Sequence, residues 1–184
     1  IILENNFIKA EIVAKGAELQ SLFSKETNIS YLWNGDAKYW GKHSPVLFPI
    51  VGALKNNEYI YQNKTYNLSR HGFARDYNFT VNQISPQEAV FSLTENEETL
   101  KSYPFRFELQ LRYKLIDQKL NLTYHVKNTG ENELLFSLGA HPAFAVPNTP
   151  DTDYQDYFLA FNDDEKLTYW KLADGLITNE KETL

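Results

Sequence analysis

Two of the four histidines in the sequence, His71 and His141, stand in segments that could form a binding site. His71 is followed by Gly72, and His141 lies between Ala140 and Pro142. Small residues beside a histidine let a ligand approach the backbone closely. An imidazole can donate or accept a proton near neutral pH, which suits general acid–base chemistry. Either histidine alone could equally be a hydrogen-bonded loop residue.

The other two histidines fit structural roles better. His125 falls on the polar face of an alternating segment, where exposure to solvent is expected. His43, between Lys42 and Ser44, could have either role, and we favour the structural one.

Other chemistries find little support in the sequence. His71 and His141 have no histidine or carboxylate at a metal-binding spacing. There is no Gly-x-Ser-x-Gly motif of a serine hydrolase and no glycine-rich phosphate loop. The absence of cysteine excludes disulfides and thiolate nucleophiles. We therefore expect no metal and no other cofactor.

Composition narrows the range of partners. The 184 residues carry a net charge of −6 and contain no basic run, which disfavours nucleic acid and anionic membranes. No apolar run reaches membrane-spanning length, and the N-terminus lacks the features of a signal peptide. A cytoplasmic protein is expected; the oligomeric state is not predicted.

The elements that must position these histidines are strands. From residue 105 to 115 apolar and polar side chains alternate strictly, and the pattern resumes over 120–126 after a short turn. A period of two predicts strands with one buried face, here paired as an antiparallel hairpin. Further strands are expected over 7–14, 17–23, 59–62, 65–68, 79–84, 89–93, 133–138, 157–161 and 167–172, with one short helix over 95–102.

Many short strands separated by polar turns predict an all-β fold, a large antiparallel β-sandwich. His71 and His141 would each follow a predicted strand, over 65–68 and 133–138. Loops at strand ends are where binding groups collect, because the sheet holds them rigidly.

Three segments, in this order, resemble the aldose 1-epimerase family. They are Ser-Pro-Val-Leu-Phe-Pro-Ile-Val-Gly at 44–52, His-Gly-Phe-Ala-Arg-Asp at 71–76 and Gly-Ala-His-Pro-Ala-Phe at 139–144. The similarity is greatest to the LacX-like branch, near the hexose-6-phosphate mutarotases. It implies a galactose mutarotase-like supersandwich and an isomerase that interconverts the α and β anomers of a hexose or hexose phosphate without a cofactor.

The resemblance also implies roles for particular residues. His141 would be the acid that protonates the ring oxygen, and His71 would hydrogen-bond the sugar near that oxygen. Arg75 could bind sugar hydroxyls or a phosphate, or brace the loop that carries His71. Phe144 could stack on the sugar or cap the sheet, and Lys42 lies near a position where some relatives have a sugar-contacting arginine.

The family's catalytic base is a glutamate near the C-terminus of a longer chain. Glu180 and Glu182 lie in a polar tail without its context, so we nominate neither. Residues 1–184 are expected to form a single β-sandwich domain, the N-terminal and central part of a longer chain. Two alternatives stay open: a non-catalytic carbohydrate-binding or sugar-sensing protein, and a β-sandwich domain attached to a glycoside hydrolase.

Overall fold

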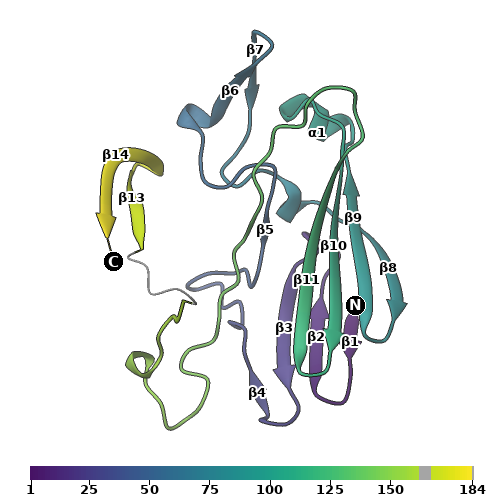
Figure 1. Ribbon diagram of the computed structural model, residues 1–184, viewed down its shortest axis with the longest axis vertical. Helices are drawn as coiled ribbons and strands as arrows, with labels where there is room; N and C mark the ends of the chain where they lie inside the picture. The colour runs from purple at the N-terminus through teal and green to yellow at the C-terminus, as the bar shows by residue number, and fades with distance from the viewer. Residues whose placement is uncertain (162–166, 184) are drawn as a thin grey trace.

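The computed structural model describes residues 1–161 and 167–183, and strands dominate it (Figure 1). One four-stranded antiparallel sheet contains β1 (Ile2–Glu4), β2 (Ile8–Ile12), β3 (Leu19–Ser24) and β4 (Ile29–Ser30), in that order. A second has the order β11-β10-β9-β8, formed by β8 (Thr80–Ser85), β9 (Glu88–Thr94), β10 (Phe107–Ile116) and β11 (Lys119–Asn128). The predicted all-β, antiparallel sandwich is confirmed.

The long hairpin β10–β11 follows the alternation in the sequence. It pairs from Phe107 with Asn128 to Ile116 with Lys119 without a register shift. Phe107, Leu109, Leu111, Tyr113 and Leu115 on β10 are all at most 4% exposed. Because side chains alternate between the two faces of a strand, one face of β10 is buried along its whole length.

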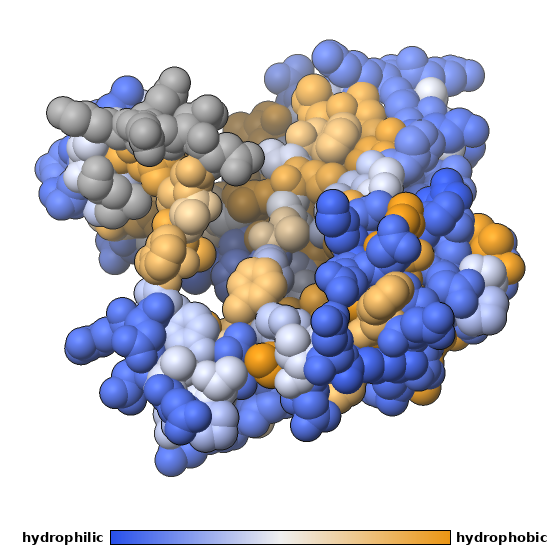
Figure 2. Space-filling model, turned by 60° about the horizontal axis from the view of Figure 1, so that its bottom comes forward, coloured by the Kyte–Doolittle hydropathy of each residue, from blue (hydrophilic) through white to orange (hydrophobic). Residues whose placement is uncertain are grey.

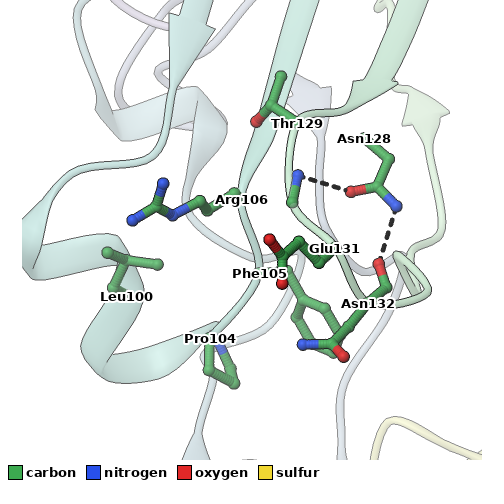
Figure 3. A pocket seen from close by; sticks show the side chains of 9 residues that line it. Leu100, Pro104, Phe105, Arg106, Asn128, Thr129, Glu131 and Asn132 are labelled. Carbon is green, nitrogen blue, oxygen red and sulfur yellow. Dashed lines mark hydrogen bonds between the residues drawn. The ribbon is translucent and has the colours of Figure 1, made fainter.

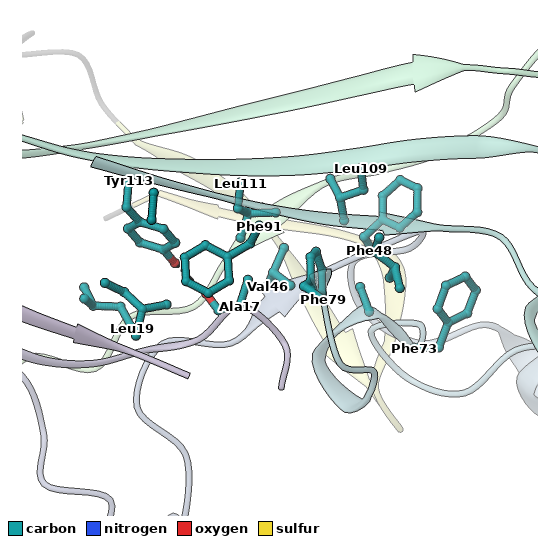
Figure 4. Close-up of a cluster of buried hydrophobic side chains, with 14 of the residues drawn as sticks. Ala17, Leu19, Val46, Phe48, Phe73, Phe79, Phe91, Leu109, Leu111 and Tyr113 are labelled. Atoms are coloured by element: carbon teal, nitrogen blue, oxygen red, sulfur yellow. Dashed lines mark hydrogen bonds between the residues drawn. The ribbon is translucent and has the colours of Figure 1, made fainter. Parts of the chain in front are cut away.

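The core lies between the two sheets (Figure 4). Side chains of β9 and β10, such as Phe91 and Leu111, pack with Leu19 of β3 and with Phe48 from the central segment. Burying each large apolar side chain contributes about 1.5–3 kcal/mol. The buried Tyr113 hydroxyl donates to the carbonyl of Ala17 at 2.8 Å, which ties the second sheet to the first.

Shorter elements complete the molecule. β5 (Val46–Leu47) pairs with β12 (Gly139–Ala140), and two hairpins are formed by β6 (Glu58–Tyr61) with β7 (Lys64–Asn67) and by β13 (Thr168–Ala173) with β14 (Leu176–Thr183). The predicted helix is confirmed as α1 (Glu97–Ser102), which Asn96 caps by accepting from two backbone N–H groups. The 3-10 helices are Lys55–Asn57, Ala74–Asp76 and Tyr154–Asp156. No helix in the described ranges is long and apolar enough to cross a membrane.

Two predicted strands are absent. Residues 133–138 form no strand: the Ser137 N–H donates to the Pro49 carbonyl, and the Leu135 carbonyl accepts from the Tyr103 hydroxyl, so loops and side chains replace a ladder. Residues 157–161 form none either, since Tyr157 is held by a local side-chain network and its apolar neighbours are exposed. The region predicted as a polar tail contains β14, which includes Glu180 and Glu182.

The part of the chain after residue 133 buries less apolar surface than the sandwich. Large apolar side chains stay exposed there: Leu135, Phe136, Phe144, Phe158, Leu159, Phe161, Trp170, Leu172 and Ile177. In Figure 2 hydrophobic side chains gather around a central hollow, whereas the right-hand flank is largely hydrophilic. The hairpin β13–β14 lies across β5 from the β8–β11 sheet (Figure 1).

Candidate active site

The fold brings His71 and His141 together from positions far apart in the chain. Their ring centroids are 6.4 Å apart. Both line a cavity of about 210 Å³, whose described lining is Trp40, Pro45, Leu47, Arg70, His71, Arg75 and His141. Since an N–H···O bond spans about 2.9 Å, the two rings leave room for one ligand oxygen to contact both.

The loop that carries His71 is fixed by close backbone packing. Gly72 has φ +68°, and its backbone forms a bridge with Phe48. A Cβ at position 72 would collide with the Phe48 carbonyl, which also accepts the N–H groups of Phe73 and Ala74. Only glycine fits both requirements. His71 itself has φ +67°, a left-handed conformation that is strained for a residue with a Cβ.

Two hydrogen bonds with Gly52 fix the His71 backbone and ring. The His71 N–H donates to the Gly52 carbonyl at 2.8 Å, and the Gly52 N–H donates to His71 Nδ1 at 3.0 Å. Because a backbone N–H can only donate, Nδ1 must be an acceptor, and the neutral ring therefore carries its proton on Nε2. His71 can offer that N–H to a ligand.

His141 is held differently. It follows directly on β12, whose pairing with β5 places it beside Pro45, and its N–H donates to the Pro45 carbonyl at 3.2 Å. Its exposed side chain packs edge-to-face with Trp40, at 5.1 Å between ring centroids. No hydrogen bond to its imidazole is formed by the residues that the structure describes.

A buried carboxylate supports the segment that leads to β5. Glu18, 8% exposed, accepts the N–H groups of His43 and Ser44 at 2.8 and 3.0 Å. Pro45 comes next in the chain after Ser44, and its carbonyl accepts the His141 N–H. Glu18 therefore helps to place His141, although Glu18 itself does not line the cavity.

The charges around His71 favour its neutral form. Burial lowers the pKa of His71, and the charges of Arg75, Arg70 and His141 lower it further. This agrees with the neutral, Nε2-protonated ring that the bond from Gly52 requires.

Arg75 braces the loop that carries His71, which is one of the two roles considered from the sequence. Its Nη2 donates to the Arg70 carbonyl at 2.9 Å, which braces the loop before His71. Its Nε lies 3.7 Å from Asp76, too far for a hydrogen bond, and is buried without a hydrogen-bond partner among the described residues. The side chain also lines the cavity, so it has donors left for a ligand.

The remaining predicted residues lie further out. Lys42 does not line the cavity, and its Nζ is 3.8 Å from Asp76. Phe144 is 59% exposed, bridges Leu32 and does not line the cavity. His43 is half-buried and outside the cavity. His125 is exposed on β11, as predicted.

The sequence interpretation missed two polar or aromatic members of the cavity, Trp40 and Arg70. Arg70 could have been found, because it precedes His71 directly. Trp40 lies 101 positions before His141, and only the pairing of β5 with β12 brings the two together.

Another cavity, of about 480 Å³, lies between the end of α1 and the turn after β11, and its described lining contains Arg106, Asn128 and Glu131 but no histidine (Figure 3). Within residues 1–161 and 167–183, no three histidine, aspartate or glutamate side chains cluster as a metal site would require.

Comparison with known proteins identifies the family. The family model described as Aldose 1-epimerase matches residues 1–183. The chain belongs to the aldose 1-epimerase family. The resemblance found in the three sequence segments is thereby confirmed.

Individual proteins of the aldose 1-epimerase type are similar to this chain over most of its length. Protein LacX of Lactococcus lactis subsp. lactis is 34% identical over 174 residues, covering 91% of this chain and 58% of LacX. The structure of a galactose mutarotase related enzyme from Lactobacillus acidophilus matches with TM-score 0.95 and 38% identity, over 100% of this chain and 61% of that one. A galactose mutarotase-like protein from Lactobacillus casei matches with TM-score 0.78 and 44% identity, over 82% and 51%. The chain thus spans about three-fifths of the length of the first two relatives.

Proposed function

We propose that this chain carries the histidine half of an aldose 1-epimerase active site, which interconverts the α and β anomers of a hexose or hexose phosphate. The observation that carries the proposal is the pair of imidazoles, 6.4 Å apart in one cavity, within a member of this family. Two nearby imidazoles of different environment suit a reaction that must place a proton on one oxygen.

The environments of the two rings support different roles. His71 offers a fixed N–H from Nε2, so it would hydrogen-bond the sugar near the ring oxygen and stabilise charge there. His141 is exposed, so it would deliver the proton that opens the ring. After opening, C1 rotates, and closure on its other face inverts the anomer.

The reaction also needs a base to remove the proton of the C1 hydroxyl. No carboxylate belongs to the described lining of the cavity, and Glu180 and Glu182 on β14 do not reach it. We propose that the base lies outside residues 1–184. The same observation favours the second candidate, a carbohydrate-binding protein without catalysis.

Polarimetry or NMR on freshly dissolved α-glucose, α-galactose and glucose 6-phosphate tests the proposal with the complete protein. Equilibration faster than in buffer for at least one sugar is expected. Buffer rates for every sugar would refute epimerase activity, and titration with the same sugars would then show whether binding alone remains.

A further inference from the structure

Trp40, whose ring contacts the imidazole of His141, lies at the end of a loop that contains neither helix nor strand. The Trp33 side chain closes this loop, because its indole Nε1–H donates to the Trp40 carbonyl at 2.8 Å. The Trp40 N–H donates in turn to the Asp36 carbonyl at 2.9 Å. Among the described residues no other donor reaches the Trp40 carbonyl, so the indole of Trp33 is what fixes this end of the loop.

The backbone of Trp33 holds the segment that carries His141. Its N–H donates to the carbonyl of Ala143, two residues after His141, at 3.0 Å. The same segment is bonded to a second part of the chain, since the N–H groups of His141 and Ala143 donate to the carbonyls of Pro45 and His43 at 3.2 and 2.8 Å. The main chain around His141 is therefore fixed by bonds to two different segments.

Trp33 thus reaches His141 by two routes, although it does not line the cavity. Its backbone bond fixes the main chain on which His141 stands, and its indole bond fixes the loop that presents the Trp40 ring, 5.1 Å from the imidazole. An indole N–H can only donate, and a partly buried one needs an acceptor. Since an active-site proton donor has to be held within about 0.5 Å of its productive position, a residue that fixes both neighbours of the imidazole affects catalysis.

We propose that Trp33 is a positioning residue for His141, which acts by holding the Trp40 ring against the imidazole through the bond from its indole N–H. The inference rests on the proposed function, since it concerns the proton donor of that reaction. Trp33 would set the orientation of the imidazole and would not contact the sugar.

Replacing Trp33 by phenylalanine removes the indole N–H and leaves the backbone bond to Ala143 in place. In the complete protein, W33F should lower kcat by about 2- to 10-fold, as expected for one lost hydrogen bond, and leave KM within about twofold. The substrate is whichever of α-glucose, α-galactose and glucose 6-phosphate the wild type converts. Unchanged kcat in W33F, or a rise in KM alone, would overturn the proposal.

The neighbouring Tyr39 provides the matched control. Its exposed ring packs edge-to-face with Trp33 at 6.3 Å, and its hydroxyl forms no hydrogen bond within the residues that the structure describes. Y39F therefore removes a polar hydrogen from an adjacent ring without breaking a bond, and its kcat should match the wild type. A loss in Y39F equal to that in W33F would show that the bond to the Trp40 carbonyl is not the cause.

A double mutant tests the route through Trp40. Because W33F acts by letting the Trp40 ring move, it should have no further effect on kcat once W40L has removed that ring. If W33F slows the reaction equally with and without Trp40, Trp33 acts by another route and the proposal fails.

NMR spectroscopy separates this inference from the proposed function, since it needs no turnover. The ring current of Trp40 acts on nearby nuclei, so W33F should shift the ring-proton signals of His141 and change those of His71, which Gly52 holds, much less. Unshifted His141 signals would overturn the positioning role even in an active epimerase. Shifted signals in a protein that converts no sugar would support the positioning role and refute only the proposed reaction.

Hydrogen exchange in the wild type gives a test that does not depend on the folding of W33F. The indole N–H of Trp33 should exchange in deuterated water more slowly than that of Trp40, which is also half-buried but donates no hydrogen bond from its indole within residues 1–161 and 167–183. Equal exchange of the two indoles would mean that the bond to the Trp40 carbonyl does not hold the loop, and the proposal would fail.

Discussion

The two histidine loops of the cavity differ in how firmly they hold the histidine side chain. His71 sits in a strained, left-handed conformation with its backbone and ring both bonded to Gly52, on a loop packed against Phe48. His141 follows a strand of two residues, and its exposed ring is contacted by Trp40. Rigidity at His71 presents one N–H in a fixed direction, whereas freedom at His141 suits a group that must gain and lose a proton.

The largest expected effect comes from breaking the rigid loop. G72A forces a Cβ into the Phe48 carbonyl at φ +68°, so the free energy of unfolding should fall by about 2–4 kcal/mol and anomer conversion should be lost. Urea denaturation and polarimetry measure the two. G41A is the control: its Cβ would lie 3.7 Å from Ala37, an ordinary contact, so stability should stay within about 0.5 kcal/mol. Unchanged stability in G72A would mean that the loop is not rigid.

The second-largest effect is expected from replacing His141, the less firmly held of the two histidines. H141N removes the proposed acid, so the rate of anomer conversion should fall by about 10²–10⁴ while circular dichroism and unfolding stay unchanged. H125N changes an exposed histidine on β11 and should leave the rate unaltered. A rate loss below tenfold would assign the proton transfer to another group.

The sequence predicted the sandwich because its pattern is local. Strict alternation over 105–115, resumed over 120–126, predicted β10 and β11, because along each strand the apolar positions are less exposed than the polar positions between them. After residue 132 the strand expected over 167–172 is present as β13. The prediction failed for the apolar segments 133–138 and 157–161, which form no ladder, and for β14, whose residues are mostly polar. There, distant partners decide the conformation, and a short apolar run cannot reveal them.

The residues of the site show the same difference between features that the local sequence reveals and features that distant partners decide. His71, His141 and Arg75 were found because small neighbours and family segments mark them. The contacts of Trp40 with His141 and of Gly175 with Arg70 depend on pairing between remote strands and hairpins, which no local spacing encodes. The resemblance to the aldose 1-epimerase family could suggest residues of the site, but it could not reveal these contacts.

A smaller effect is expected from the contact that limits the freedom of His141. W40L removes the edge-to-face partner 5.1 Å away, so catalysis should slow by about 2- to 12-fold, corresponding to about 0.5–1.5 kcal/mol for an aromatic pair. W40F keeps an aromatic ring and should lose less. Equal losses in both variants would show that indole size, rather than the aromatic contact, positions the imidazole.

The smallest effect is the contribution of His71 to the pH dependence of the free energy of unfolding. Its pKa in the folded protein lies below the ordinary value of 6.5, so between these values the unfolded chain binds more protons. The free energy of unfolding should therefore fall as the pH drops from 6.5 through the folded pKa, and H71N should remove this part of the slope. Asparagine tolerates the left-handed backbone, so the comparison isolates the ring. An NMR midpoint for His71 at or above 6.5 would make it a second proton donor like His141, and the division of roles between the two loops would fail.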